Sequence, residues 1–123
     1  KYGGPEKFYG DFYISSVSPL GFTSSGKGCK STNFNYYDSR QLTAAIKDFA
    51  VSSLNRQLEF GIKRDVCFCL GTGKNFKYLD RLNDEFGFFK EIIPLEHPRF
   101  IMQYKSREKD SYINSYIEKF QLV

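Results

Sequence analysis

His97 is the only histidine of the chain, and it stands in a short segment whose residue types could do chemistry. Ile92 and Ile93 lead into Pro94, and Pro98 follows His97 directly. An apolar run that ends at a polar, proline-locked turn is typical of a strand that delivers side chains at its carboxyl end. The residue before a proline is held in an extended conformation, so the backbone of His97 is restricted. If the sheet is parallel, that end faces the ligand crevice of an α/β fold.

The spacing alone favours a simpler interpretation, in which His97 is a solvated side chain at the exit of an edge strand. A local run of basic and polar residues follows it, interrupted by Glu108: Arg99, Gln103, Lys105, Arg107 and Lys109. Apolar residues are interleaved with this run: Phe100, Ile101, Met102 and Tyr104. Such a segment suits phosphate contacts together with a wedge into a base stack. As a charge run alone, it is more typical of a solvated loop that leads to the next helix.

The glycines of Gly71-Thr72-Gly73 lie at a predicted junction between a strand and a helix. A dinucleotide-binding motif would need a third glycine where Phe76 stands, and a P-loop would need its lysine further from Gly71 than Lys74. A modest anion site at the start of the helix is one interpretation. A tight turn that requires glycine is the favoured one.

Few residues of the sequence indicate a metal site or a catalytic nucleophile. One histidine cannot build a histidine-rich metal site, and no Ser-His-Asp triad or carboxylate pair stands out. The three cysteines, Cys29, Cys67 and Cys69, fit neither a zinc site nor a C-x-x-C pair. We therefore expect reduced thiols, a cytoplasmic protein, and no metal or cofactor.

The composition predicts one domain with a single core. The chain has 123 residues, a length that suits a single core, and 18% of them are aromatic. Its net charge of +4 is only mildly basic. No stretch has the length of a membrane span, and the start lacks a signal-peptide pattern, so we expect no membrane contact. We also expect a monomer.

The pattern of elements predicts an α/β fold with three parallel strands, in the order β-α-β-α-β-α. The strands are expected at residues 11–18, 65–70 and 92–95, with 67–70 interior and 92–95 at an edge because Pro94 cannot donate to a ladder. Helices are expected from an Asp38 cap to Gly61, from Phe76 to Gly87, and from about Glu108. Residues 1–10 are expected to lack regular structure, and residues 24–31 are expected to form a loop that carries Lys27 and Lys30.

Three short motifs together resemble the uracil-DNA glycosylase superfamily, in particular its single-strand-selective monofunctional branch and bacterial relatives. Ser16-Val17-Ser18-Pro19-Leu20 is similar to the Asn-x-Cys-Pro-Leu strand end of that branch. Residues 70–74, Leu-Gly-Thr-Gly-Lys, are similar to its third-strand turn, and His97-Pro98-Arg99 is similar to its His-Pro-Ser-Pro motif. The motifs lie in the family's order at similar spacings, and only their conjunction is specific.

The resemblance implies a three-layer α/β/α sandwich with a small parallel sheet, and a base-excision repair enzyme that flips out uracil or a related base and hydrolyses its N-glycosidic bond. It implies that His97 is catalytic and that Ser16 and Ser18 bind the base. DNA would be held, as a single strand or a locally opened duplex, by Arg99, Gln103, Lys105, Arg107, Lys109 and Lys74, with Lys27 and Lys30 as weaker candidates.

The sequence departs from the family in two places. The family reads the uracil edge with an asparagine amide, whereas Ser16 offers a hydroxyl that cannot make the same paired contact. The family's first motif, on its central strand, has no counterpart, so residues 1–123 are expected to be the carboxyl-terminal portion of one such domain, without catalysis of its own. Two alternatives stay open: a non-catalytic DNA- or nucleotide-binding module on the same fold, and an unrelated Rossmann-like enzyme, which Phe76 argues against.

Overall fold

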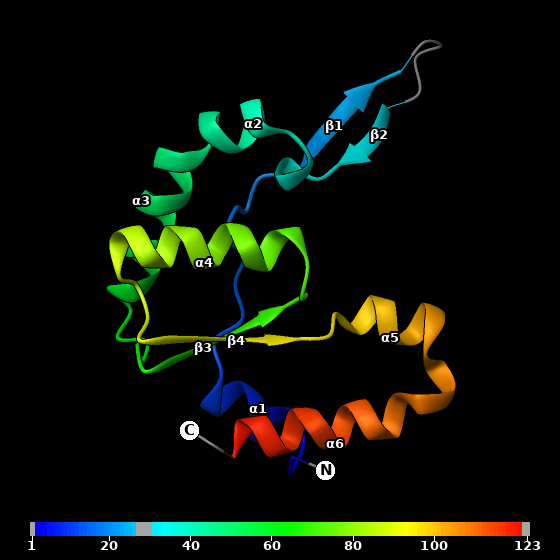
Figure 1. Cartoon of the computed structure of the whole chain (residues 1–123). Coiled ribbons are helices and arrows are strands. Elements are labelled where there is room, and N and C mark those ends of the chain that lie inside the picture. The colour runs from blue at the N-terminus through cyan, green and yellow to red at the C-terminus, as the bar shows by residue number, and fades with distance from the viewer. Residues whose placement is uncertain (1, 27–30, 122–123) are drawn as a thin grey trace.

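A computed structural model describes residues 2–26 and 31–121 of the chain (Figure 1). The helices and strands follow in the order α1 (Pro5–Asp11), β1 (Phe22–Ser25), β2 (Ser31–Phe34), η1 (Tyr36–Asp38), α2 (Arg40–Ala45), α3 (Lys47–Leu58), β3 (Val66–Leu70), α4 (Lys74–Phe86), β4 (Glu91–Leu95), α5 (Pro98–Tyr104), η2 (Ser106–Glu108) and α6 (Lys109–Phe120). No helix within these residues is long and apolar enough to cross a membrane.

The parallel pair β3 and β4 forms the centre of the fold. Cys67 lies opposite Ile92 and Leu70 lies opposite Leu95, and α4 makes the crossover between the two strands. Figure 1 shows α3 and α4 on one face of this pair and α1 and α6 on the other. The predicted α/β fold with helix layers on both faces of a small parallel sheet is therefore confirmed.

The core lies between the sheet and the helices α3 and α4, which cover one of its faces. Leu79 and Leu82 of α4 are almost completely buried, and the same holds for Ala50 of α3 and for Phe88 just before β4. Helix α4 stops where the sequence predicts, because Gly87 adopts a left-handed conformation with a φ of 63°. This placement fixes the direction in which β4 enters the sheet.

Aromatic rings fill the opposite face of the sheet. Phe68 of β3 lies 4.9 Å from the ring centroid of Phe120 on α6 and 6.0 Å from that of Phe12. Phe8 of α1 stacks on Phe12 at 4.9 Å. Ring pairs of this kind add to the burial of apolar area, so they hold α1 and α6 against the strands.

The prediction of three parallel strands is wrong. Residues 11–18 form no strand: α1 ends at Asp11, and residues 12–21 have no ladder partner among the described residues. In the described residues β3 pairs only with β4, so the strand at 67–70 is not interior. The β-branched and aromatic composition of residues 11–18 favours an extended backbone, but composition cannot supply a neighbouring strand.

Residues 24, 25 and 31, predicted as part of a loop, belong to the antiparallel pair of strands β1 and β2 instead. Strands β1 and β2 pair with Thr23 opposite Asn33, and polar residues such as Ser24 and Thr32 bond each other across the strands at 3.0 Å. Lys27 and Lys30 lie outside the described residues. Because the hairpin carries few apolar residues, its hydrophobic pattern gave no strand signal.

The helix predicted from Asp38 starts one residue later and is divided. Ser39 is the N-cap of α2, since its Oγ accepts from the Leu42 amide at 3.2 Å, and Asp38 belongs to η1. Ile46, buried to 6% exposure, separates α2 from α3. The predicted helix therefore covers both α2 and α3, whereas the break at Ile46 has no residue signal such as proline or glycine.

Two short helices were missed. Helix α1 begins at Pro5 in the segment expected to be irregular, and α5 begins at Pro98 in the segment described as a loop. Proline is well suited to the first position of a helix, where its missing N–H has no partner in any case. In both segments the proline was interpreted as a breaker although it starts a helix.

Candidate functional site

His97 lies where β4 ends and α5 begins, and its side chain is exposed. Its backbone is extended, with φ −66° and ψ 130°, as expected for a residue before proline. The Nδ1 atom accepts a hydrogen bond from the Arg99 amide at 3.1 Å and so caps α5. An accepting ring nitrogen carries no proton, so the imidazole proton is on Nε2, which is left as a donor.

The backbone around His97 is held by its own strand and helix neighbours. The Leu95 carbonyl accepts from the Gly71 amide at 2.7 Å, and the His97 carbonyl accepts from the Ile101 amide at 3.2 Å. Leu95 is 1% exposed and Ile101 is 7% exposed, so the core anchors the chain on both sides of the histidine. The imidazole is thus presented from a backbone with little freedom to move.

Helix α6 completes this support from the other face of the sheet. The Lys119 ammonium donates to the Pro94 carbonyl at 3.1 Å, and the Tyr116 hydroxyl donates to the Glu96 carbonyl. Burial raises the pKa of Tyr116, with the charge of Glu96 adding to the effect, so the hydroxyl keeps its proton for this bond. All four carbonyls from Pro94 to His97 therefore accept a hydrogen bond. We call residues 94–97 the His97 loop.

The polar residues predicted to contact DNA gather on α5 and the two elements after it. Arg99, Gln103, Arg107 and Lys109 are exposed. Lys105 is half-buried and forms an ion pair with Glu108 at 3.2 Å, and its hydrogen bond to Glu108 raises its pKa. The basic residues are thus presented to solvent from α5, η2 and α6, rather than from the solvated loop that a charge run alone favours.

The apolar residues interleaved with this basic run divide into two groups. Ile101 is buried and anchors α5, whereas Phe100 is 41% exposed, Met102 63% and Tyr104 67%. The rings of Phe100 and Tyr104 contact each other at 5.6 Å on one side of the helix. Exposed apolar side chains and exposed polar or basic side chains therefore lie side by side on α5.

The glycine turn after β3 is the tight turn that the sequence favoured. Gly71 has a φ of +126°, a conformation that side chains rarely adopt. The Lys74 ammonium, at the start of α4, pairs with the Asp38 carboxylate at 2.6 Å, and this bond lowers the pKa of Asp38. Lys74 therefore has a partner within the protein, and its proposed phosphate contact would have to compete with Asp38.

The two serines predicted to bind the base have different surroundings. Ser16 is exposed on the segment without a strand partner, and Ser15 beside it bonds to Gln57 of α3. Ser18 is 9% exposed and lines an open cavity between η1 and the β1–β2 hairpin. No residue of the His97 loop lines that cavity, so the structure does not bring Ser18 and His97 into one pocket.

The described cysteines and acidic residues offer no alternative chemistry. Burial raises the pKa of the Cys67 thiol to about 11 and raises that of Cys69 as well, so neither is a ready nucleophile. Both are free thiols, and Cys29 lies outside the described residues. Within residues 2–26 and 31–121 no group of three His, Cys, Asp or Glu side chains could hold a metal ion.

Sequence reasoning missed the role of α6 at this site. Tyr116 was expected only as an apolar residue of the last helix, and Lys119 was not singled out. Their spacing of three residues places both on one side of the helix, but nothing in a sequence shows that this side faces the carbonyls of a distant strand.

Two comparisons with known proteins find matches, one to a family model and one to a solved structure. The family model of the uracil DNA glycosylase superfamily matches residues 5–121. The crystal structure of wild-type SMUG2 from Pedobacter heparinus is similar, with 53% sequence identity and a TM-score of 0.93. The alignment covers 98% of this chain and 52% of that one, so this chain spans about half the length of that protein. No curated protein matches.

Proposed function

Because the chain belongs to the uracil-DNA glycosylase superfamily, we propose that the full-length protein is a DNA glycosylase that removes uracil or a related damaged base. The observation that carries this proposal is the hydrogen bond from the Arg99 amide to His97 Nδ1, which leaves the Nε2 proton free at the carboxyl end of the sheet. The proposed reaction is hydrolysis of the N-glycosidic bond between the base and its deoxyribose.

The proposed role of His97 follows from how charge moves in that reaction. When the glycosidic bond breaks, its electron pair goes to the base, and negative charge builds on the base oxygens. A donor at such an oxygen is stronger in the transition state than in the ground state, so it accelerates the reaction. The support of the His97 loop keeps reorganisation small, which makes a preorganised donor of this kind effective.

The target base must leave the helix stack before these atoms can meet. We propose that the exposed apolar residues of α5, Phe100, Met102 and Tyr104, push into the space that the base vacates. Arg99, Gln103, Arg107 and Lys109 would hold the neighbouring phosphates, with smaller contributions from Lys105 and Lys74 because both are paired with carboxylates.

The resemblance alone assigns base selection to Ser16 and Ser18, and we retain only Ser16 for the target base, because Ser18 lines a cavity that no residue of the His97 loop lines. A serine hydroxyl can donate and accept, but it cannot offer both groups side by side as an amide does. We therefore propose a less strict choice of base than an asparagine would give. A preference for single-stranded DNA, a monomeric state and a cytoplasmic location stay predictions of the sequence.

The decisive experiment separates the chemistry of His97 from its capping role. In the full-length protein, His97→Asn keeps a side-chain oxygen that can cap α5, but its amide is too short to place a donor where Nε2 lies. Single-turnover excision of uracil from single-stranded DNA should fall about 100-fold or more, as when an oxyanion-hole donor is lost. Affinity for DNA should change little, because phosphate contacts dominate it.

Glu96→Gln serves as the matched control, since it changes the neighbouring side chain and leaves the backbone bonds of the His97 loop in place. This variant should excise uracil at the wild-type rate. Robust excision by His97→Asn would remove His97 from the mechanism. A wild-type protein that binds DNA without excising any base would instead favour the non-catalytic binding module.

A further inference from the structure

An open cavity of about 340 Å³ lies between η1 and the β1–β2 hairpin, apart from the His97 loop. Its walls include Ser18, Phe22, Asn33, Asn35, Tyr36 and Tyr37. None of its lining residues was assigned to catalysis, and only Ser18 entered the base-binding prediction. The cavity is large enough for a planar ligand the size of a nucleobase.

The lining has the chemistry that recognises an aromatic heterocycle. The Phe22 and Tyr36 rings lie 6.3 Å apart and the Tyr36 and Tyr37 rings 5.1 Å apart, both edge to face. Asn33 and Asn35 add amide groups at the exposed rim, and among the described residues no charged side chain lines the cavity. Aromatic rings stack on bases of any sequence, and amides bond to base edges. A phosphate or a carboxylate would find no charge partner among these lining residues.

Ser18 gives the cavity an unused polar group. Its side chain is 9% exposed, and its Oγ has no hydrogen-bond partner among the described residues. Buried hydroxyls in native proteins nearly always have a partner, so an unpaired one indicates a group that is satisfied by something else. An aliphatic occupant would leave Ser18 unpaired, whereas the polar edge of a base could pair with it.

A chain of contacts connects this cavity to the His97 loop. The Tyr36 hydroxyl donates to Asn75 Oδ1 at 2.5 Å, so the cavity wall is fixed to the first turn of α4. The turn just before α4 contains Gly71, whose amide bonds to the Leu95 carbonyl, two residues before His97. Figure 1 shows the hairpin and α5 on the same side of the molecule, the side toward which β3 and β4 point.

We propose that this cavity binds the unstacked base of a second nucleotide in the DNA strand whose target base faces His97. The proposal rests on the proposed function, because only a strand held at α5 brings a second base to the cavity. The protein would thereby read or grip a flanking nucleotide as well as the target. A free base or nucleoside has the same chemistry, and the experiment distinguishes its binding from the binding of a base within a DNA strand.

The experiment measures binding of the full-length protein, by fluorescence anisotropy, to a single-stranded oligothymidylate of 12 nucleotides with one central 2′-fluoro-2′-deoxyuridine, whose N-glycosidic bond resists hydrolysis and which fixes the register of the strand. Tyr37→Leu removes a stacking surface and should weaken binding about 10-fold, within the range for loss of one base–aromatic stack. Asn33→Ala removes an exposed amide and should weaken binding about 3-fold, in the range for a neutral hydrogen bond. Thr23→Ala is the matched control, because Thr23 pairs with Asn33 across the hairpin and does not line the cavity. It should bind as the wild type does.

An abasic nucleotide is then moved along the oligonucleotide, one position at a time. In the wild type, an abasic nucleotide at one position should weaken binding as much as Tyr37→Leu does. In Tyr37→Leu, an abasic nucleotide at that same position should not weaken binding further, as for two groups in direct contact. The same binding by all variants, or a loss at every position alike, would overturn the proposal. Should Tyr37→Leu fail to fold, Asn33→Ala with the same abasic series gives the answer, since Asn33 is exposed.

Thymidine alone serves as the probe for a free nucleoside. If Tyr37→Leu abolishes thymidine binding but no oligonucleotide position is coupled to Tyr37, the cavity takes a free nucleoside and the proposal is wrong. The measurement needs no excision. A protein that binds as expected but removes no uracil would thus contradict the proposed activity and leave the flanking-base site standing.

Discussion

Residues 91–97, which contain β4 and the His97 loop, and residues 12–20 differ sharply although their sequences give the same local signal. Both contain a β-branched or aromatic run that ends at a proline, Pro94 in one and Pro19 in the other. The first run is a strand because β3 offers it a parallel partner, with Leu70 opposite Leu95. The second has no ladder partner among the described residues and forms no strand. A strand thus requires two segments that pair, and a local sequence pattern describes only one of them.

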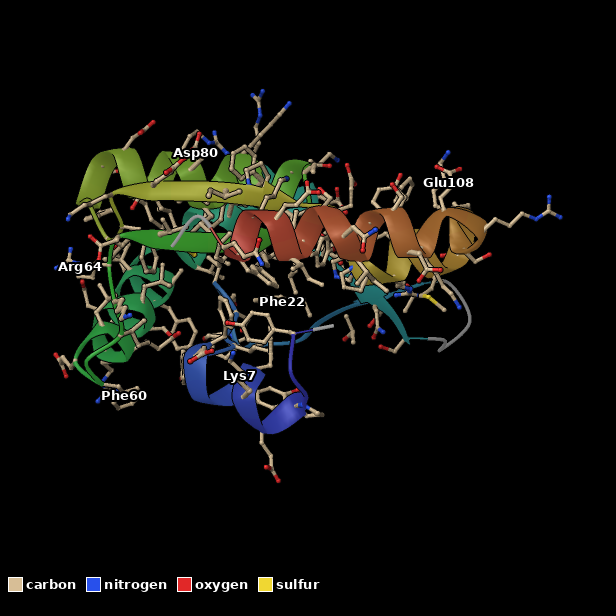
Figure 2. The ribbon with its side chains drawn as sticks, turned by 90° about the horizontal axis from the view of Figure 1, so that it is seen from below. Lys7, Phe22, Phe60, Arg64, Asp80 and Glu108 are labelled. Atoms are coloured by element: carbon tan, nitrogen blue, oxygen red, sulfur yellow. The ribbon has the colours of Figure 1, made fainter. Side chains whose placement is uncertain are left out.

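Burial separates the same two regions. Leu95 and Ile101, on either side of His97, are 1% and 7% exposed. Tyr13 and Ile14 of the other segment are more than half exposed. Figure 2, which views the molecule from below, shows the segment after α1 running past the sheet toward the labelled Phe22. The comparison indicates that buried residues anchor the chain on both sides of His97, whereas at Ser16 they do so only on the carboxyl side, where Val17 is 8% exposed.

The largest expected effect tests this difference in stability. Leu95→Ala should lower the free energy of unfolding by about 2–5 kcal/mol, because a fully buried leucine is replaced by a cavity. Ile14→Ala, at 55% exposure, should change it by less than about 0.5 kcal/mol. Urea unfolding of the full-length protein followed by circular dichroism measures both. Equal losses would mean that residues 12–20 are packed as tightly as β4.

A smaller effect is expected where α6 supports the His97 loop. Tyr116→Phe removes the hydroxyl that bonds the Glu96 carbonyl, and it should cost about 1 kcal/mol of stability, the typical net value of one hydrogen bond. The Arg99 amide, bonded to His97 Nδ1, should then exchange its hydrogen faster. Hydrogen exchange followed by NMR gives the comparison.

Tyr112→Phe, one turn earlier on the same helix, is the control for Tyr116→Phe and should leave exchange at Arg99 unchanged. Unaltered exchange in Tyr116→Phe would show that β4 and α5 hold the His97 loop without α6.

The smallest expected effect concerns charge, which also divides the two regions. Residues 12–20 contain no charged side chain, whereas the segment after His97 contains several basic ones. If Arg107 contacts a DNA phosphate, Arg107→Ala should reduce the slope of log affinity against log salt by about 0.7–0.9. Lys105→Ala should reduce the slope less, because Glu108 already pairs with Lys105. Salt titrations of binding to single-stranded DNA measure the slopes, and a slope unaffected by Arg107→Ala would make this segment a solvated surface.

Some elements of the fold were predictable because their signals are local. The apolar spacing of α4 and the glycine at its end fixed this helix, since Leu79, Leu82 and Gly87 act through neighbouring turns. The apolar run of β3 and the turn at Gly71 were equally clear. Pro5 and Pro98 were misread because a proline both ends one element and starts the next, and the sequence does not say which.

The sequence by itself determined that His97 has a restricted backbone at a strand exit, that basic and apolar residues follow it, and that three motifs resemble one family. Only the tertiary structure decided that Nδ1 is occupied by the Arg99 amide, that Tyr116 and Lys119 hold the carbonyls beside His97, and that Lys74 is paired with Asp38. The physical reason is the distance along the sequence over which each interaction acts. Proline geometry and helical periodicity act within a few residues, whereas a hydrogen bond between α6 and the end of β4 requires both elements to pack against the same sheet.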